Sequence, residues 1–430
     1  MLDSMADVAP FRALRYDPSL DLAAVICPPF DTISPEQQAE LYARSGHNAV
    51  RIELAQTSGP GRYENAATAL REWMAANVLR RDSVPSYYLY DQSFPYGDRT
   101  YTRQLLFAAL RVVPWDAGEV LPHEQTFGAP KEDRIQLMRA AHINGSPIFL
   151  FYRDADGRIR DILRDQERQN LPLFEFETAD GHRHRLVRID EPEGVVAVRE
   201  EFAGETLYIA DGHHRYETAL AYRDEVRAAA GEWTGDEPEN FALVGLVAED
   251  DPGMLVLPIH RITASGADWP TVRARLEELF DLAPTTGDGG DVASILATKP
   301  GAFGFAVADA ETPFILTPKD RDALDEALPQ DRSAGWRSLD YSVCNHAIMR
   351  RCLGLTDDQM RDYSTVWFSE DAREAFGQVQ GGRARYAVVL NPLPVSRVLE
   401  MADAGERMPQ KSTFFYPKIP SGLVFNLLEA

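Results

Sequence analysis

A histidine–arginine turn in the middle of the chain carries the densest set of reactive side chains. The turn reads Asp211-Gly212-His213-His214-Arg215. The apolar run 207–210 before it is typical of a strand, and residues 215–230 have the composition of a helix. The start of a helix offers unpaired backbone N–H groups and the positive end of the helix dipole, which together bind phosphate. We therefore interpret the turn as an anion-binding site.

The side chains of this turn would add chemistry to the backbone site. Arg215 offers a planar fork that can hold two phosphate oxygens, and His213 and His214 add two protonatable rings beside Gly212. Asp211 is the candidate general base, or a ligand for a magnesium ion that bridges phosphate oxygens. The alternative is that the histidines only cap the helix and contact the core. Adjacent histidines rarely face one ion, so we predict no dedicated metal site.

A second cluster lies on a loop framed by prolines. His123 and Glu124 form a potential acid and base pair on this loop. Lys131 and Arg134 follow, one turn apart on the helix expected after Pro130, so the two cations could share one phosphate group. The alternative is a loop that is stabilised by solvated salt bridges, which are common on an acidic surface.

A third cluster lies in the segment 409–418. Lys411 and Lys418 flank two hydroxyl residues and three aromatic residues there. Lys411 is the candidate anion ligand. So dense an aromatic run predicts that the segment packs back into the body of the protein. The alternative is a strand that completes the core, with Lys418 at its exposed end.

Composition excludes several classes of protein. The 430 residues are 44% hydrophobic and 26% charged, which is typical of a folded globular protein too large for a single core. The net charge of −23 argues against nucleic acid as a partner. No apolar run approaches the ~20 residues that span a bilayer, so we expect no membrane association. The three cysteines lack zinc or disulfide spacing, which favours a reducing, cytoplasmic location.

Short helices and short strands are both expected along the chain, which predicts a mixed α/β (α+β) fold. Helices are expected at 34–45 with Ser34 as cap, and at 63–79, 215–230, 270–279 with Asp268 as cap, 341–353 and 371–379. Strands are expected at 48–54, 87–92, 99–113, 148–152, 173–178, 184–189, 207–210, 241–248, 254–260, 304–307, 314–316 and 386–390. We expect a hairpin around 95–98, pairing of 241–248 with 254–260, and a polar loop at 287–290. No clear linker appears, so residues 1–430 are treated as one unit with tentative lobes 1–265 and 266–430.

Six blocks of the chain, in order, resemble the family catalogued as domain of unknown function 1015. The blocks are Phe11–Ala13, Cys27–Asp31, Asn48–Leu54, Pro122–Glu124 with Pro130–Arg134, Asp211–Arg215 and Met408–Lys418. They span almost the whole chain, which is therefore identified as a member of that family.

The turn is also similar to the phosphate-binding motif of the ParB and sulfiredoxin-like superfamily. That superfamily includes nucleotide-binding partition proteins and free serine kinases. The resemblance is local and implies a small mixed α and β module in which nucleotide phosphates rest at the start of the helix that carries Arg215. The chain has no recognisable helix-turn-helix module, so a small-molecule phosphotransferase fits better than chromosome partition. Serine or phosphoserine is the first substrate this implies.

We therefore predict an enzyme that transfers or hydrolyses a phosphoryl group on a small molecule. Asp211 or Glu124 would act as base, and Lys131 and Arg134 would neutralise charge on the transferred group. Magnesium with ADP or ATP is the cofactor that such an activity implies. The alternative is a non-catalytic, nucleotide-binding regulatory protein of the ParB-like kind. The sequence gives no oligomeric state.

Overall fold

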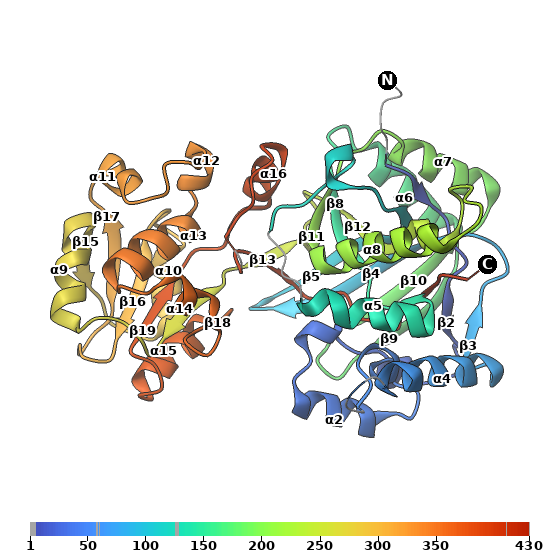
Figure 1. Ribbon diagram of the computed structural model, residues 1–430, viewed down its shortest axis with the longest axis horizontal. Helices are drawn as coiled ribbons and strands as arrows, with labels where there is room; N and C mark the ends of the chain where they lie inside the picture. The colour runs from blue at the N-terminus through green and yellow to red at the C-terminus, as the bar shows by residue number, and fades with distance from the viewer. Residues whose placement is uncertain (1–5, 57–58, 60, 125–128, 410, 430) are drawn as a thin grey trace. The chain divides into compact units, whose positions relative to one another are not determined.

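The computed structural model of the protein describes residues 6–56, 59, 61–124, 129–409 and 411–429 (Figure 1). The chain forms two compact units. The first contains Met1–Pro122, Thr126–Leu255 and Pro417–Ala430, and the second contains His123–Gln125 and Val256–Tyr416. These limits differ from the lobes 1–265 and 266–430 suggested by the sequence, because the segment after residue 416 returns to the first unit.

A mostly antiparallel sheet of nine strands forms the centre of the first unit. Its strands are β1 (Val8–Ala9), β4 (Tyr87–Tyr96), β5 (Arg99–Arg111), β6 (Val120–Leu121), β8 (Ile148–Tyr152), β9 (Pro172–Glu177), β10 (Arg183–Ile189), β11 (Leu207–Asp211) and β12 (Phe241–Ala248). The order is β6-β11-β8-β12-β5-β4-β10-β9, with β1 on β5. Among the described strands of this sheet, only the pairs β11/β6 and β12/β8 are parallel. The predicted hairpin is confirmed as β4 and β5, and the mixed α/β fold is confirmed with it.

Two layers of helices accompany this sheet. One layer packs its apolar side chains on the sheet face that contains Leu150 and Leu246. It consists of α5 (Ala129–Ala141), α6 (Arg158–Gln169), α7 (Pro192–Phe202) and α8 (His213–Ala229), and Figure 1 shows α5 and α8 side by side. A second core contains α1 (Leu22–Val25), α2 (Pro35–Arg44), α3 (Val50–Glu53), α4 (Gly61–Ala75), β2 (Leu14–Tyr16), β3 (Leu79–Arg81), β7 (Ile143–Asn144) and β21 (Asn426–Leu427). Short 3-10 turns lie at Phe30–Thr32, Trp115–Ala117 and Pro238–Asn240.

The strand predicted at 48–54 is wrong, since this stretch contains the helix α3. Asn48 explains the difference, because its side chain accepts a hydrogen bond from Val50 N (3.0 Å) and donates to two carbonyl oxygens of α1 and its end. Val50 and Ile52 alternate as they would in a strand, but both are buried within a single tight turn. The helix predicted after Ser34 is confirmed, and the Ser34 hydroxyl accepts a hydrogen bond from Gln37 N.

A six-stranded antiparallel sheet forms the second unit. Its strands, in the order β15-β17-β16-β19-β14-β18, are β15 (Phe280–Pro284), β17 (Phe314–Pro318), β16 (Phe303–Val307), β19 (Tyr386–Val389), β14 (His260–Thr263) and β18 (Val366–Ser369). The helices are α9 (Trp269–Leu279), α10 (Gly289–Leu296), α11 (Arg321–Glu326), α12 (Ala334–Arg337), α13 (Asp340–Val343), the π-helix η4 (Cys344–Cys352), α14 (Asp357–Arg361), α15 (Ala372–Gln380) and α16 (Val395–Asp403). A separate pair joins β13 (Leu255–Leu257) to β20 (Phe414–Tyr416).

Two further predictions are wrong in this part of the chain. The strands at 241–248 and 254–260 do not pair with each other, because β12 lies between β5 and β8 while β13 pairs with β20. The expected loop at 287–290 contains the start of α10, which the Asp288 carboxylate caps by accepting from Asp291 N. The cap of α9 by Asp268 is confirmed.

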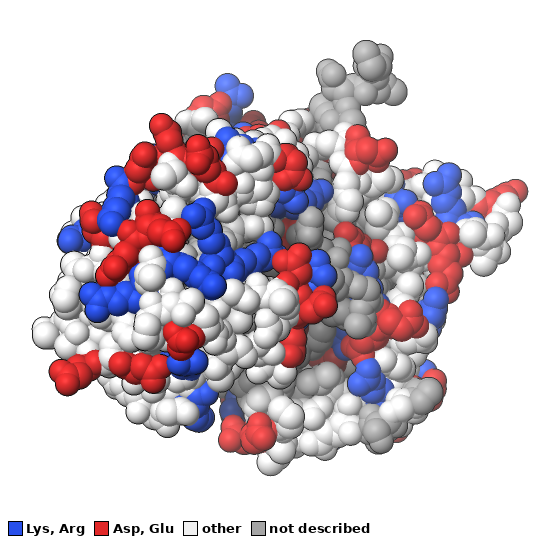
Figure 2. Space-filling view, turned by 60° about the vertical axis from the view of Figure 1, so that its left-hand side comes forward, with Lys and Arg blue, Asp and Glu red and all other residues white. Residues whose placement is uncertain are grey.

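Two surface expectations can be compared with the structure. No helix among the described residues is long and apolar enough to cross a membrane. Figure 2 shows one face of the molecule, where a row of Lys and Arg side chains is bordered by acidic ones. That nucleic acid is not a partner stays a prediction.

Candidate functional site

The histidine–arginine turn has the strand, turn and helix that its sequence predicts. Strand β11 ends at Asp211, Gly212 adopts a φ of +92°, and α8 begins at His213. A φ of this sign is strained for residues with a side chain. A Cβ at position 212 would also lie 2.9 Å from Arg215 Nε, so the guanidinium packs directly over the glycine. Glycine is therefore required here for both conformation and space.

Two cations hold the carboxylate of Asp211. Arg215 Nη2 and Lys418 Nζ each donate to Asp211 Oδ2 at 3.1 Å, and Arg215 Nη1 donates to the Pro147 carbonyl. Burial by itself would raise the pKa of Asp211, but the charges of Lys418, Arg215 and His213 together hold that pKa well below its ordinary value. Asp211 is therefore an ionised anchor for two cations. A carboxylate so easily ionised is a weak general base at neutral pH.

The two histidines occupy the first turn of α8 in different environments. His213 is buried and His214 is half-buried. The His214 carbonyl accepts a hydrogen bond from the Thr218 hydroxyl at 2.7 Å. Among the residues that the structure describes, no group of three potential ligands could hold a metal ion. The catalytic roles predicted for the histidines stay predictions.

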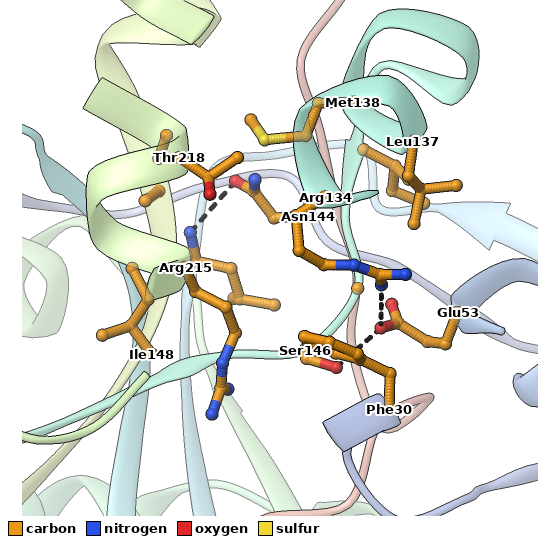
Figure 3. A pocket seen from close by; sticks show the side chains of 15 residues that line it. Phe30, Glu53, Arg134, Leu137, Met138, Asn144, Ser146, Ile148, Arg215 and Thr218 are labelled. Carbon is orange, nitrogen blue, oxygen red and sulfur yellow. Dashed lines mark hydrogen bonds and ion pairs between the residues drawn. The ribbon is translucent and has the colours of Figure 1, made fainter. Parts of the chain in front are cut away.

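A cavity of about 40 Å³ opens beside Arg215, between α5, α8 and the loop that joins β7 to β8 (Figure 3). Its polar lining comes from Glu53, Arg134, Asn144, Ser146, Arg215 and Thr218, and the rest is apolar. A single water needs roughly 10–15 Å³ on this scale, so the cavity takes a few waters or a small polar molecule. It is too small for a whole nucleotide.

Glu53 is the most unusual group in this cavity. Its side chain is 2% exposed, Ser146 Oγ donates to Oε2 at 2.7 Å, and Arg134 Nη1 lies 3.5 Å from the same oxygen. Figure 3 shows both side chains directed at Glu53 from different elements. The other oxygen, Oε1, is buried and has no hydrogen-bond partner. It lies against Gly145, where any Cβ would collide with it. An unsatisfied buried carboxylate oxygen is costly, so it calls for a ligand or a functional reason.

Arg134 links this carboxylate to its surroundings. Its guanidinium lies 3.8 Å from the centre of the Phe30 ring and binds Asp133 Oδ2 at 2.5 Å. Burial lowers the pKa of Arg134, against the opposing effect of Glu53. Asp133 also accepts hydrogen bonds from Arg62 and from the Tyr63 hydroxyl. The arginine is therefore held in place by packing and by a second carboxylate.

Lys131 does not share its partner with Arg134. It forms an ion pair with Glu217 of α8, whereas Arg134 contacts Asp133 and Glu53. The ion pair joins α5 to α8 one turn after the histidines. The structure thus gives the two cations separate carboxylates, and their sharing of one phosphate stays a prediction.

Three predicted site residues lie in the second unit. His123 and Glu124 belong to it, as does Lys411. The His123 carbonyl accepts from Met408 N at 2.8 Å, and His123 Nε2 lies 3.4 Å from Thr413 Oγ1. His123 of the second sequence cluster thus contacts the third cluster within this unit, whereas Lys131, Arg134 and Lys418 belong to the first unit. That these clusters act with Asp211 stays a prediction.

Sequence reasoning missed Glu53, Ser146 and Lys418 as parts of the site. Glu53 carried a usable signal, because it is a charged residue inside an apolar stretch that the structure buries. Ser146 carried none, and Lys418 was noted only as a flanking lysine and as the exposed end of a strand, whereas its side chain is 18% exposed and contacts Asp211.

Comparisons with known proteins identify a family and several solved structures. The model of the family described as "Protein of unknown function (DUF1015)" matches residues 8–342. A conserved hypothetical protein from Pyrococcus furiosus is 15% identical, with 75% of this chain and 95% of that chain covered and a TM-score of 0.35. Free serine kinase in complex with AMP is 14% identical, with 75% and 91% covered and a TM-score of 0.34. SbnI with C-terminal truncation from Staphylococcus aureus is 13% identical, with 74% and 86% covered and a TM-score of 0.35. No curated protein matches the chain.

Proposed function

The chain belongs to the DUF1015 family, and from that premise we propose that its first unit transfers or hydrolyses a phosphoryl group on a small molecule. One observation carries the proposal. The buried, unsatisfied Oε1 of Glu53 lines the same cavity as Arg215 of the phosphate-binding turn. A base and a phosphate ligand on one small cavity are the two parts that phosphoryl transfer requires.

In this proposal the phosphate rests on the first turn of α8. The Arg215 guanidinium packs over Gly212, so in this proposal it turns toward the phosphate, neutralises its oxygens and leaves the N–H groups at the start of α8 to bind them. A substrate hydroxyl or a water in the cavity gives its proton to Glu53 as its oxygen bonds to phosphorus. The bond from phosphorus to the leaving oxygen breaks, and Arg215 stabilises the charge that develops there.

The size and charge of the cavity favour a small zwitterionic substrate. Its volume of about 40 Å³ takes a molecule the size of a small amino acid. The free oxygen of Glu53 would accept from an ammonium or a hydroxyl, and Arg134 lies beside it to offset the added charge. Serine or phosphoserine remains our first candidate.

A nucleotide, if it is the phosphate donor, would lie mostly outside the cavity. In this proposal its phosphates would lie at the turn that the αL residue Gly212 and Arg215 form. Magnesium would be held by phosphate oxygens with Asp211 as the ionised carboxylate of the turn, and it would neutralise charge on the phosphates. We propose the cytoplasm as the site of action, since Cys27, Cys344 and Cys352 are free and buried.

Binding measurements test the proposal directly. Calorimetric titration of ADP, ATP, CTP and phosphoserine, with magnesium, would be compared between the wild type, Arg215→Ala and Arg215→Lys. Arg227→Ala is the matched control, because Arg227 lies exposed on the same helix. We expect one ligand whose affinity falls in both Arg215 variants but not in the control. No binding by any of the four ligands would contradict the proposal.

A turnover assay distinguishes the proposed enzyme from the alternative, a nucleotide-binding regulatory protein. The ligand that binds would be incubated with serine, or alone for hydrolysis, and phosphate transfer followed over many equivalents. Sustained product formation supports an enzyme. Tight binding without turnover would instead support a nucleotide-binding regulatory protein.

A further inference from the structure

Asn144 supplies the cavity beside Glu53 with an amide whose orientation is fixed. It lies in β7, which pairs with β21, and it lines the cavity. Its Oδ1 accepts hydrogen bonds from Leu243 N of β12 at 3.2 Å and from Asn426 Nδ2 at 3.4 Å. Turning the amide over would direct its NH2 group at these two N–H donors. The oxygen is therefore held by β12 and β21, and the nitrogen is left for another partner.

That nitrogen, Nδ2, has no acceptor among the residues that the structure describes. Figure 3 shows the amide of Asn144 between the side chains of Thr218 and Arg134, which line the same cavity. An amide NH2 group carries two donors. The cavity therefore contains a hydrogen-bond donor that is positioned by the fold and open to a ligand.

The other donors among the polar side chains of the lining already have acceptors. Arg134 binds Asp133, and Arg215 binds Asp211. Ser146 donates to the buried carboxylate of Glu53, and Thr218 donates to a carbonyl of its own helix. Asn144 is thus the side chain in this lining that can bind an acceptor without breaking a contact of the free protein.

Glu53 supplies the complementary group. Its side chain is 2% exposed, and its Oε1 has no hydrogen-bond partner. A ligand that satisfies both residues donates to Glu53 and accepts from Asn144, within a cavity of about 40 Å³. A small amino acid carries an ammonium group and a carboxylate a few bonds apart. It also enters with no net charge, which reduces the cost of removing its ammonium group from water.

We propose that Asn144 determines the specificity of this cavity, by binding the carboxylate of a small amino acid whose ammonium or hydroxyl group donates to Glu53. An amine without a carboxylate is discriminated against, because it would cover the amide of Asn144 without giving it an acceptor. This inference rests on the proposed function only in taking the cavity as the substrate site. It requires no phosphate at the turn.

Calorimetric titration of the wild-type protein with L-serine and with ethanolamine tests the proposal. The two molecules carry the same ammonium and hydroxyl groups, and only serine has a carboxylate. We expect serine to bind about tenfold or more tightly than ethanolamine, as a charge-assisted hydrogen bond allows. Equal affinity for the two molecules, or binding of neither, overturns the proposal.

Asn144→Asp changes the recognition at constant size. The new carboxylate can still accept from Leu243 N and Asn426 Nδ2, but it offers the cavity a negative charge in place of a donor. We expect affinity for serine to fall about tenfold or more and affinity for ethanolamine to stay or rise. Asn77→Asp is the matched control, since Asn77 is exposed in the same unit and should leave both affinities unchanged.

Two results with Asn144→Asp would contradict the proposal. Equal weakening of both ligands would show that Asn144 only supports the fold, and unchanged affinity for serine would show that its NH2 group binds nothing. If Asn144→Asp does not fold, Asn144→Ser decides, because it shortens the side chain and removes the NH2 group without adding a charge. Serine and ethanolamine should then bind with similar affinity, and a retained preference for serine would overturn the proposal.

Failure of this inference is distinguishable from failure of the proposed function. Serine binding that depends on Asn144 as expected, without phosphoryl transfer in the turnover assay, would leave the role of Asn144 intact and overturn the transfer. Phosphoryl transfer by a protein that binds neither serine nor ethanolamine would leave the proposed function intact and overturn the role of Asn144.

Discussion

Replacing Gly212 with alanine tests the turn at its most constrained point. The backbone there has a φ of +92°, and the left-handed region costs a residue with a Cβ about 1–2 kcal/mol. The new methyl group would lie 2.9 Å from Arg215 Nε and 3.0 Å from Cζ, so the guanidinium must move. We expect the loss of stability together with a loss of phosphate-ligand affinity. A charge-assisted contact is worth about 1.5–3 kcal/mol, which is about 10- to 100-fold in affinity.

Gly157 provides the matched control for this variant. It also precedes a helix, α6, as an N-cap glycine, and it has a φ of +74°. A Cβ at that position would meet nothing within 4 Å. Gly157→Ala should therefore carry the backbone strain alone. The difference between the two variants isolates the displacement of Arg215.

Thermal or urea unfolding and calorimetric titration of the ligand found for the wild type would be measured on both variants. We expect both proteins to be destabilised, Gly212→Ala by more because the displaced Arg215 also loses its contact with Asp211, and only Gly212→Ala to lose affinity. Wild-type affinity in Gly212→Ala would show that binding does not require the position of Arg215. Equal loss of affinity in both variants would show that the effect is global.

Three other changes have definite expected outcomes. Glu53→Gln should lower turnover by about 10²–10⁴-fold and leave ligand binding at the turn intact, as steady-state kinetics and calorimetry would show. Ser146→Ala removes a donor to buried Glu53 and should lower the free energy of unfolding by about 1 kcal/mol, measured by denaturant titration. The pKa of Asp211 is lowered in the folded protein, so its ionised form stabilises the fold above about pH 4, and this stabilisation is lost as the pH falls toward the lowered pKa. Asp211→Asn should therefore melt lower than the wild type at pH 7, and the two melting curves should converge on acidification.

Sequence signals that span a few residues predicted the helices, strands and turn of the site better than they predicted contacts between residues far apart in the sequence. The caps Ser34 and Asp268 and the turn at Gly212 were predicted correctly, because each depends on hydrogen bonds or dihedral angles within a few residues. The helix α3 was missed because its alternating apolar residues imitate a strand, while Asn48 turns the backbone through contacts with α1. The spacing of apolar residues along the sequence does not reveal contacts with another element such as α1.

The cavity was not predictable for a related reason. Glu53, Arg134 and Ser146 come from α3, α5 and the loop before β8, and only the packing of these elements brings them together. Lys418 reaches Asp211 across more than two hundred residues of sequence. A sequence shows which residues have reactive groups, but it does not show which of them the fold places within 4 Å of each other.

The return of the segment after residue 416 has a consequence for synthesis on the ribosome. Phe425 and Leu428 are buried in the two cores of the first unit, yet they are translated only after all of Val256–Tyr416. At roughly 5–20 residues per second, that stretch takes on the order of ten to thirty seconds. The nascent first unit passes this time without Lys418 beside Asp211 and without β21 beside β7. A chain released before this segment would therefore lack both β21 and the contact of Lys418 with Asp211.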